Sequence, residues 1–148
     1  MNPVSRILVP TDLSECAGAA AAWAAGLARQ LGAVIELVTV VDTTHFNEIY
    51  GDETLRNQRI AHIRGEAGKQ LEAFAQRYLG GLEQVRREVR DGNTMQEILA
   101  AAGEKGCELI VMGTHGRTGV AHLLIGSVAE KVVRQSTVPV LTVRPPRA

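Results

Sequence analysis

The chain has 148 residues, 45% hydrophobic and 22% charged, so we expect a single folded domain over residues 1–148 with its own core. Its sixteen basic and sixteen acidic residues cancel, and a neutral chain lacks the broad positive surface that binds nucleic-acid phosphates, so we expect no nucleic-acid partner. No apolar run has the length of a membrane span or a secretory signal, which indicates a cytoplasmic protein with no membrane partner.

The chain begins with an apolar segment followed by a helical one. Residues 6–10 form a short, β-branched run, typical of a strand buried on both faces of a parallel sheet. An alanine-rich helix is predicted over residues 14–32, with Ser14 as its N-cap and Gly32 as its C-terminal stop. We expect Trp23, within this helix, to be a core anchor.

The rest of the chain continues this alternation. We expect strands over residues 34–41, 82–90, 107–112 and 138–143, and helices over residues 54–79, 95–105 and 127–135. The strand at 82–90 alternates apolar and charged residues, which suits an outer position in a sheet. The polar stretch 42–53 is predicted to be a loop, and either Asn93 or Thr94 is expected to cap the following helix.

Five strands alternating with four helices predict an α/β fold, a doubly wound five-stranded parallel sheet of order 3-2-1-4-5 with helices on both faces. Open parallel sheets bind ligands outside the carboxyl ends of their strands, where the strand order reverses. That point lies between the first and fourth strands. The segment Thr11-Asp12 is therefore expected to face the loop Gly113-Thr114-His115-Gly116, about a hundred residues away.

The glycine loop has the composition of a phosphate site. Gly113 and Gly116 allow sharp turns that present backbone N–H groups at close range. Gly126 and Ser127 open the last predicted helix, whose first N–H groups and dipole favour an anion. The Ser127 hydroxyl adds a hydrogen-bond donor. A glycine-rich turn without a ligand remains the alternative.

The facing segment offers a carboxylate. Asp12 can accept two hydrogen bonds from a ribose, although it can also be an ordinary helix cap. The sequence contains neither G-x-x-x-x-G-K-[ST] nor G-x-G-x-x-G, so it is neither a P-loop protein nor a dinucleotide-binding protein of the usual fingerprint. Arg117 is the cation of the loop. Its side chain could contact a terminal phosphate or could simply be exposed to solvent.

Cys16 and Cys107 form no C-x-x-C pair, and we expect both to be reduced, packed thiols.

The spacing Gly113-x2-Gly116-x9-Gly126-Ser127 resembles the glycine signature of the universal stress protein family, in its ATP-binding branch. The resemblance covers nearly the whole chain, although many relatives carry a proline just after the glycine of the turn that here reads Gly92-Asn93-Thr94. It implies that an adenine nucleotide, ATP, is bound by Pro10, Thr11, Asp12, Val40, Met112, Gly113, Thr114, His115, Gly116, Gly126, Ser127 and Val128, and we include Arg117 as a candidate from its place in the loop. Among them, Asp12 would hold the ribose or adenine side, and the backbone of Val40 would contact the adenine edge.

The resemblance also implies a homodimer that pairs the last strands, from Val138 to Val143, of two protomers. An apolar strand at the edge of a sheet has unpaired backbone N–H and C=O groups that another strand can bind, which is consistent with such a dimer. Any Mg²⁺ or Mn²⁺ would be held by the nucleotide phosphates. The sequence alone identifies no carboxylate or second histidine that would orient His115 as a catalytic base. We therefore expect binding in preference to efficient catalysis, in a nucleotide-dependent stress-response regulator with an unknown protein partner. A slow ATPase or phosphotransferase using Thr114, His115 or Arg117, and a dimeric scaffold without nucleotide, remain alternatives.

Overall fold

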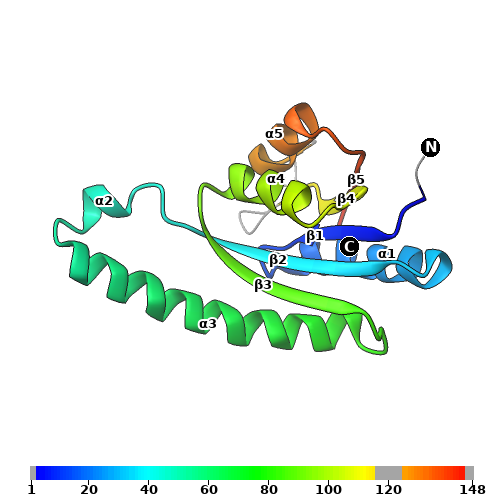
Figure 1. Cartoon of the computed structure of the whole chain (residues 1–148), viewed down its shortest axis with the longest axis horizontal. Helices are drawn as coiled ribbons and strands as arrows, with labels where there is room; N and C mark the ends of the chain where they lie inside the picture. Colours follow the sequence, from blue (N-terminus) through cyan, green and yellow to red (C-terminus); the bar gives the residue numbers. More distant parts are fainter. Residues whose placement is uncertain (1–2, 116–124, 146–148) are drawn as a thin grey trace.

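The computed structural model of the chain describes residues 3–115 and 125–145. Its five parallel strands form one sheet in the order β3-β2-β1-β4-β5, which confirms the predicted order (Figure 1). The order reverses between β1 and β4, so the carboxyl ends of these two strands flank a natural ligand crevice. The strands are β1 (Arg6–Pro10), β2 (Val34–Asp42), β3 (Val85–Gly92), β4 (Leu109–Gly113) and β5 (Val140–Val143).

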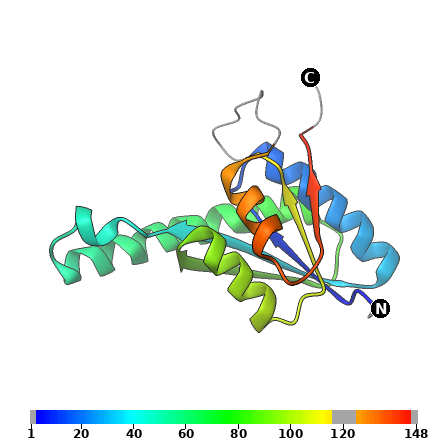
Figure 2. The ribbon, with the colours of Figure 1, turned by 90° about the horizontal axis from the view of Figure 1, so that it is seen from above.

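Helices cover both faces of the sheet (Figures 1 and 2). They are α1 (Glu15–Leu31), α2 (Phe46–Ile49), α3 (Glu53–Leu79), α4 (Thr94–Glu104) and α5 (Ser127–Gln135). The alternation of side chains along β1 builds a core on each side: Ile7 and Val9 pack toward α1 and α3, whereas Leu8 packs toward α4 and α5. None of the described helices is long and apolar enough to cross a membrane.

Helix α1 lies close to the sheet because its inward face is made of small residues. Ser14 caps it by accepting a hydrogen bond from the Ala17 N–H at 3.2 Å, and Gly32 ends it in the left-handed conformation at φ 64°. The prediction that Trp23 anchors the core is wrong, since its side chain is 61% exposed. The face of α1 that packs on the sheet is made of alanines, among them Ala21 and Ala24, and Trp23 lies on the exposed face of the helix.

Several predicted bounds shift for local reasons. The expected loop at 42–53 contains the short helix α2, and β2 extends to Asp42, opposite Gly92 of β3. Strand β5 begins two residues later than predicted, because the Ser136 hydroxyl donates to the Val138 carbonyl at 2.7 Å and accepts from the Val138 N–H at 3.1 Å. This turn ends α5 and delays the start of the strand.

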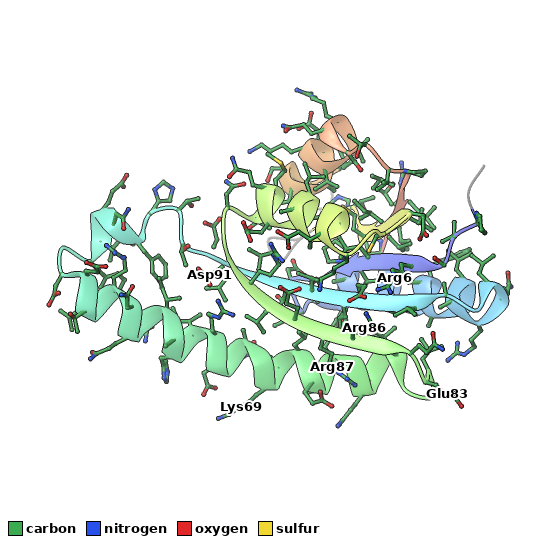
Figure 3. All side chains as sticks on the ribbon, viewed as in Figure 1. Arg6, Lys69, Glu83, Arg86, Arg87 and Asp91 are labelled. Atoms are coloured by element: carbon green, nitrogen blue, oxygen red, sulfur yellow. The ribbon has the colours of Figure 1, made fainter. Side chains whose placement is uncertain are left out.

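A buried carboxylate ties the amino-terminal ends of the strands together. Glu36 on β2 is 2% exposed, and its carboxylate lies 3.1 Å from Arg6 Nη1, 3.4 Å from Arg86 Nη1 and 3.7 Å from Lys105 Nζ. Arg6 and Arg86 flank β2 in Figure 3. A buried charge is tolerated only when it is paired, so this cluster joins β1, β2, β3 and the end of α4.

A second carboxylate fixes the start of β1 against β4. Glu108 accepts hydrogen bonds from the Ser5 hydroxyl at 2.7 Å, the Ser5 N–H at 3.2 Å and the Arg6 N–H at 2.8 Å. The hydrogen bond from the Ser5 side chain, followed by those from the backbone, lowers the pKa of Glu108. This carboxylate therefore favours the folded chain in its ionised form.

Candidate functional site

A cavity of about 310 Å³ opens at the carboxyl ends of β1 and β4, where the strand order reverses. This volume lies at the lower end of the range of ordinary ligand pockets. The segments from the two halves of the chain meet in it, as the topology predicts. Its lining includes every predicted site residue that the structure describes: Pro10, Thr11, Asp12, Val40, Met112, Gly113, Thr114, His115, Gly126, Ser127 and Val128. The predicted site residues Gly116 and Arg117 lie outside the described residues.

The lining also contains residues that the sequence analysis did not select: Ala17, Val38, Thr94, Ile98 and Ala129. Val38 shares a face of β2 with Val40, so the alternation of the strand was a usable signal. Thr94 belongs to the turn at which the sequence departs from many relatives of the family it resembles. Nothing in the sequence alone placed Thr94 in the cavity, because only the packing of α4 on the sheet brings it there.

The segment after β1 forms a tight turn at the edge of the cavity. The Thr11 hydroxyl oxygen accepts from the Leu13 N–H at 2.9 Å, and Asp12 Oδ1 accepts from the Ser14 N–H at 3.0 Å. Leu13 has φ 70°, the one positive φ of a residue other than glycine among the described residues. Such a conformation costs free energy and is held by its surroundings, here at the cavity edge. Asp12 therefore stabilises the turn and also faces the cavity.

Two segments of the glycine signature are joined directly at the other edge. The Gly126 N–H donates to the Thr114 carbonyl, and the Thr114 N–H donates to the Val143 carbonyl at 3.0 Å. Gly126 is the N-cap of α5 and gives it no side-chain cap, so the first N–H groups of this helix have no acceptor from a cap residue. They lie in the lining with Ser127 and Val128, where an anion can accept from them.

The end of β4 passes very close to α1. A Cβ added to Gly113 would lie 3.3 Å from the carbonyl oxygen of Cys16, a tighter contact than nine in ten real Cβ contacts. Glycine at this position thus lets the chain turn into the cavity without pushing α1 away. The same close packing holds the floor of the cavity in place.

The hydroxyl and thiol side chains near the carboxyl end of β4 are Thr114 and Cys16. The Thr114 hydroxyl lies 2.8 Å from His115 Nδ1, and Thr114 is only 4% exposed. Burial raises the pKa of the Cys16 thiol, and burial also raises the pKa of Cys107, which lies at the opposite end of β4, to about 11, so both thiols stay protonated near neutral pH. Among residues 3–115 and 125–145, no three His, Cys, Asp or Glu side chains are grouped to hold a metal ion.

The two ends of the cavity differ in chemistry. The end beside α5 presents backbone N–H groups and the Ser127 hydroxyl, whereas the end between β2 and α4 is lined by Val38, Val40 and Ile98, with Thr94 as its polar side chain. The arrangement suits a molecule that is apolar at one end and anionic at the other. A polar edge containing Asp12 lies at the end of β1, between the two.

Comparison with known proteins points to one family. A model of the universal stress protein family matches residues 3–144 of the chain. Universal stress protein MJ0531 of Methanocaldococcus jannaschii is 33% identical over 148 residues, which cover 99% of this chain and 85% of that protein. Universal stress protein YxiE of Bacillus subtilis is 32% identical, with 95% of this chain and 99% of that protein covered.

Solved structures give the same picture. The structure of MJ0577, a universal stress protein of Methanocaldococcus jannaschii, superposes with a TM-score of 0.86 at 28% identity, covering 99% of this chain and all of that one. A universal stress protein solved in complex with cAMP superposes with a TM-score of 0.63 at 23% identity, covering 98% of this chain and all of that one. At this lower identity the likeness is one of fold.

Proposed function

The chain belongs to the universal stress protein family, and from this premise we propose that it is a regulatory protein whose cavity binds an adenine nucleotide, with ATP as the first ligand to test. The observation that carries the proposal is the amino terminus of α5, which receives no side-chain cap from Gly126 and lines the same cavity as the mostly apolar residues of β2 and α4. The amino terminus of α5 suits phosphates, and the apolar residues of β2 and α4 suit a purine ring.

The assignment of roles follows the lining. Backbone N–H groups at Ser127 and Val128, with the Ser127 hydroxyl, would donate to phosphate oxygens. Asp12, at the edge of the first strand, would accept from the ribose hydroxyls. The base would then lie between Val40 and Ile98. One universal stress protein was solved in complex with cAMP, whose base is adenine, and this supports testing adenine nucleotides first.

We propose binding in preference to rapid catalysis. Phosphoryl transfer needs charge neutralisation by metal ions and a positioned nucleophile, and the protein would rely on Mg²⁺ or Mn²⁺ carried by the phosphates. Slow hydrolysis at Thr114 and His115 is a separate, testable activity. Phosphate release above a protein-free control that disappears in Gly113→Val, with the fold retained, would establish it.

We also propose that the protein is a homodimer joined through β5. This strand lies at the edge of the sheet and pairs only with β4 among the described strands. Its Leu141 is 37% exposed, and an apolar edge strand is a template for another strand. Leu141→Lys should shift the protein toward monomer in sedimentation velocity. An unchanged sedimentation coefficient would argue against this interface.

The nucleotide proposal has a direct test. The purified protein is denatured, and any released small molecule is identified by mass spectrometry. The refolded or nucleotide-free protein is then titrated with ATP in a calorimeter. We expect a released adenine nucleotide or a saturable 1:1 heat of binding per protomer. Absence of both, with a folded protein by circular dichroism, would contradict the proposal.

A further inference from the structure

Strands β1 and β2 separate at the edge of the cavity, and a threonine side chain lies at the point of separation. Their parallel pairing ends with Pro10 opposite Val38, and the Thr11 N–H donates to the Val38 carbonyl at 2.8 Å. A continued ladder would next pair the Thr11 carbonyl with a backbone N–H of β2. Beyond the end of the ladder, the Thr39 hydroxyl donates to this carbonyl at 2.8 Å. The Thr11 carbonyl is thus bound by a side chain of β2.

This hydrogen bond is buried. Thr39 is 5% exposed and Thr11 is 7% exposed, so water has little access to replace the hydroxyl as a donor. Thr39 lies outside the described lining of the cavity, whereas Thr11 and Asp12 belong to it. The Thr39 hydroxyl can therefore affect a ligand only through the segment that it holds.

That segment is the turn that carries Asp12. The Thr11 hydroxyl oxygen accepts from the Leu13 N–H at 2.9 Å, and Leu13 has φ 70°. Asp12 Oδ1 accepts from the Ser14 N–H at 3.0 Å and from the Ser14 hydroxyl at 2.5 Å. A positive φ is unfavourable for leucine, so the turn keeps its shape only when its two ends are fixed. Thr39 fixes its first residue, and Ser14, the N-cap of α1, fixes its last.

We propose that Thr39 is a positioning residue of the nucleotide site, whose hydroxyl holds the Asp12 carboxylate where it can accept hydrogen bonds from the ribose. The inference rests on the proposed nucleotide function. The carbonyl that Thr39 binds belongs to the planar peptide group between Thr11 and Asp12, so a rotation of this group moves Asp12. Loss of the hydroxyl favours such a rotation, because a buried carbonyl without a donor is costly. The nucleotide then keeps its base and phosphate contacts and loses its ribose contact.

The test compares ATP with 2′,3′-dideoxy-ATP, which lacks both ribose hydroxyls, by titration calorimetry. The wild-type protein should bind ATP roughly 10- to 100-fold more tightly, as expected for a hydrogen bond to a charged group. Thr39→Val keeps the shape of the side chain. It should reduce this ratio to below about 3-fold and leave the affinity for dideoxy-ATP within about 2-fold of wild type. Thr39→Ser should retain the wild-type ratio, because it keeps the hydroxyl.

A double-mutant cycle separates positioning from general destabilisation. In the Asp12→Ala background, Thr39→Val should change the affinity for ATP by less than about 2-fold, because the group that it positions is gone. An equal loss in both backgrounds, an unchanged ratio, or equal weakening of both nucleotides would overturn the inference. If Thr39→Val does not fold by circular dichroism, Thr39→Ala and Thr39→Ser serve as a pair that differs only by the hydroxyl. Equal ratios in that pair would also overturn it.

The wild-type protein distinguishes failure of this inference from failure of the proposed function. If the folded protein binds neither nucleotide, the proposed function fails, and this inference fails with it. If it binds ATP and dideoxy-ATP with the same affinity, the nucleotide function stands and the positioning role of Thr39 fails.

Discussion

Replacing Gly126 by aspartate should separate the stability of α5 from the binding of phosphate. Gly126 has φ −74° and ψ 163°, which any residue can adopt, and it gives α5 no side-chain cap. An aspartate there supplies the missing N-cap acceptor and a charge at the positive end of the helix, which stabilises the fold by a few tenths to about 1 kcal/mol. The same carboxylate occupies the N–H groups proposed for the phosphate.

The cost to binding follows from Coulomb's law. Two like charges about 4 Å apart at an effective dielectric constant of about 20 repel by roughly 4 kcal/mol. We therefore expect Gly126→Asp to weaken ATP by about 100- to 1,000-fold in titration calorimetry, while its melting temperature stays equal to wild type or rises.

Gly126→Asn is the matched control, because it adds a capping side chain of the same size without the charge. It should lose less than about 10-fold in ATP affinity. If Gly126→Asp melts as the wild type does and binds ATP within twofold of it, the phosphate does not lie at the start of α5.

Three further predictions concern the turn after β1, the contact of α1 with α3 and the start of β1. Asp12→Ala should weaken ATP by roughly 1.5–3 kcal/mol in calorimetry, and a change below a few tenths would make Asp12 only a cap. A Cβ on Gly18 would lie 2.3 Å from the Tyr78 ring, whereas one on Gly26 has nothing within 4 Å. In urea unfolding, Gly26→Ala should therefore be more stable than Gly18→Ala by about 1–3 kcal/mol, and equal stabilities would contradict the close helix contact. The folded-state pKa of Glu108 is lowered from 4.5, so its stabilisation is present above that pH and lost as the pH falls through the lower folded value. Glu108→Gln should be less stable than wild type at pH 7 and approach it in acid; a difference independent of pH would refute this linkage.

The sequence predicted the sheet correctly because its signals are local and repeated. Four of the strands are short, mostly apolar runs and β3 alternates apolar with charged residues, and the helices between them require crossover connections, so alternation and handedness indicate a doubly wound parallel sheet, whose order is 3-2-1-4-5. The cavity residues at the strand ends, among them Asp12 and Gly113, followed from that order. The ends of the strands were predicted less accurately. The hydrogen bonds of Ser136 delay the start of β5, and the pairing of Asp42 with Gly92 extends β2, and neither contact is visible in a hydrophobic pattern.

By itself, the sequence determined the fold, the family and the meeting of the first and fourth strands, because hydrophobic periodicity, glycine spacing and topology rules depend on order along the chain. Tertiary structure alone decided which side chains complete the site. The face of α1 that packs on the sheet is made of alanines, which leaves Trp23 exposed, and the packing of α4 brought Thr94 and Ile98 to a cavity that begins more than eighty residues earlier, at Pro10. Such contacts depend on how surfaces fit in three dimensions, and no local pattern encodes that fit.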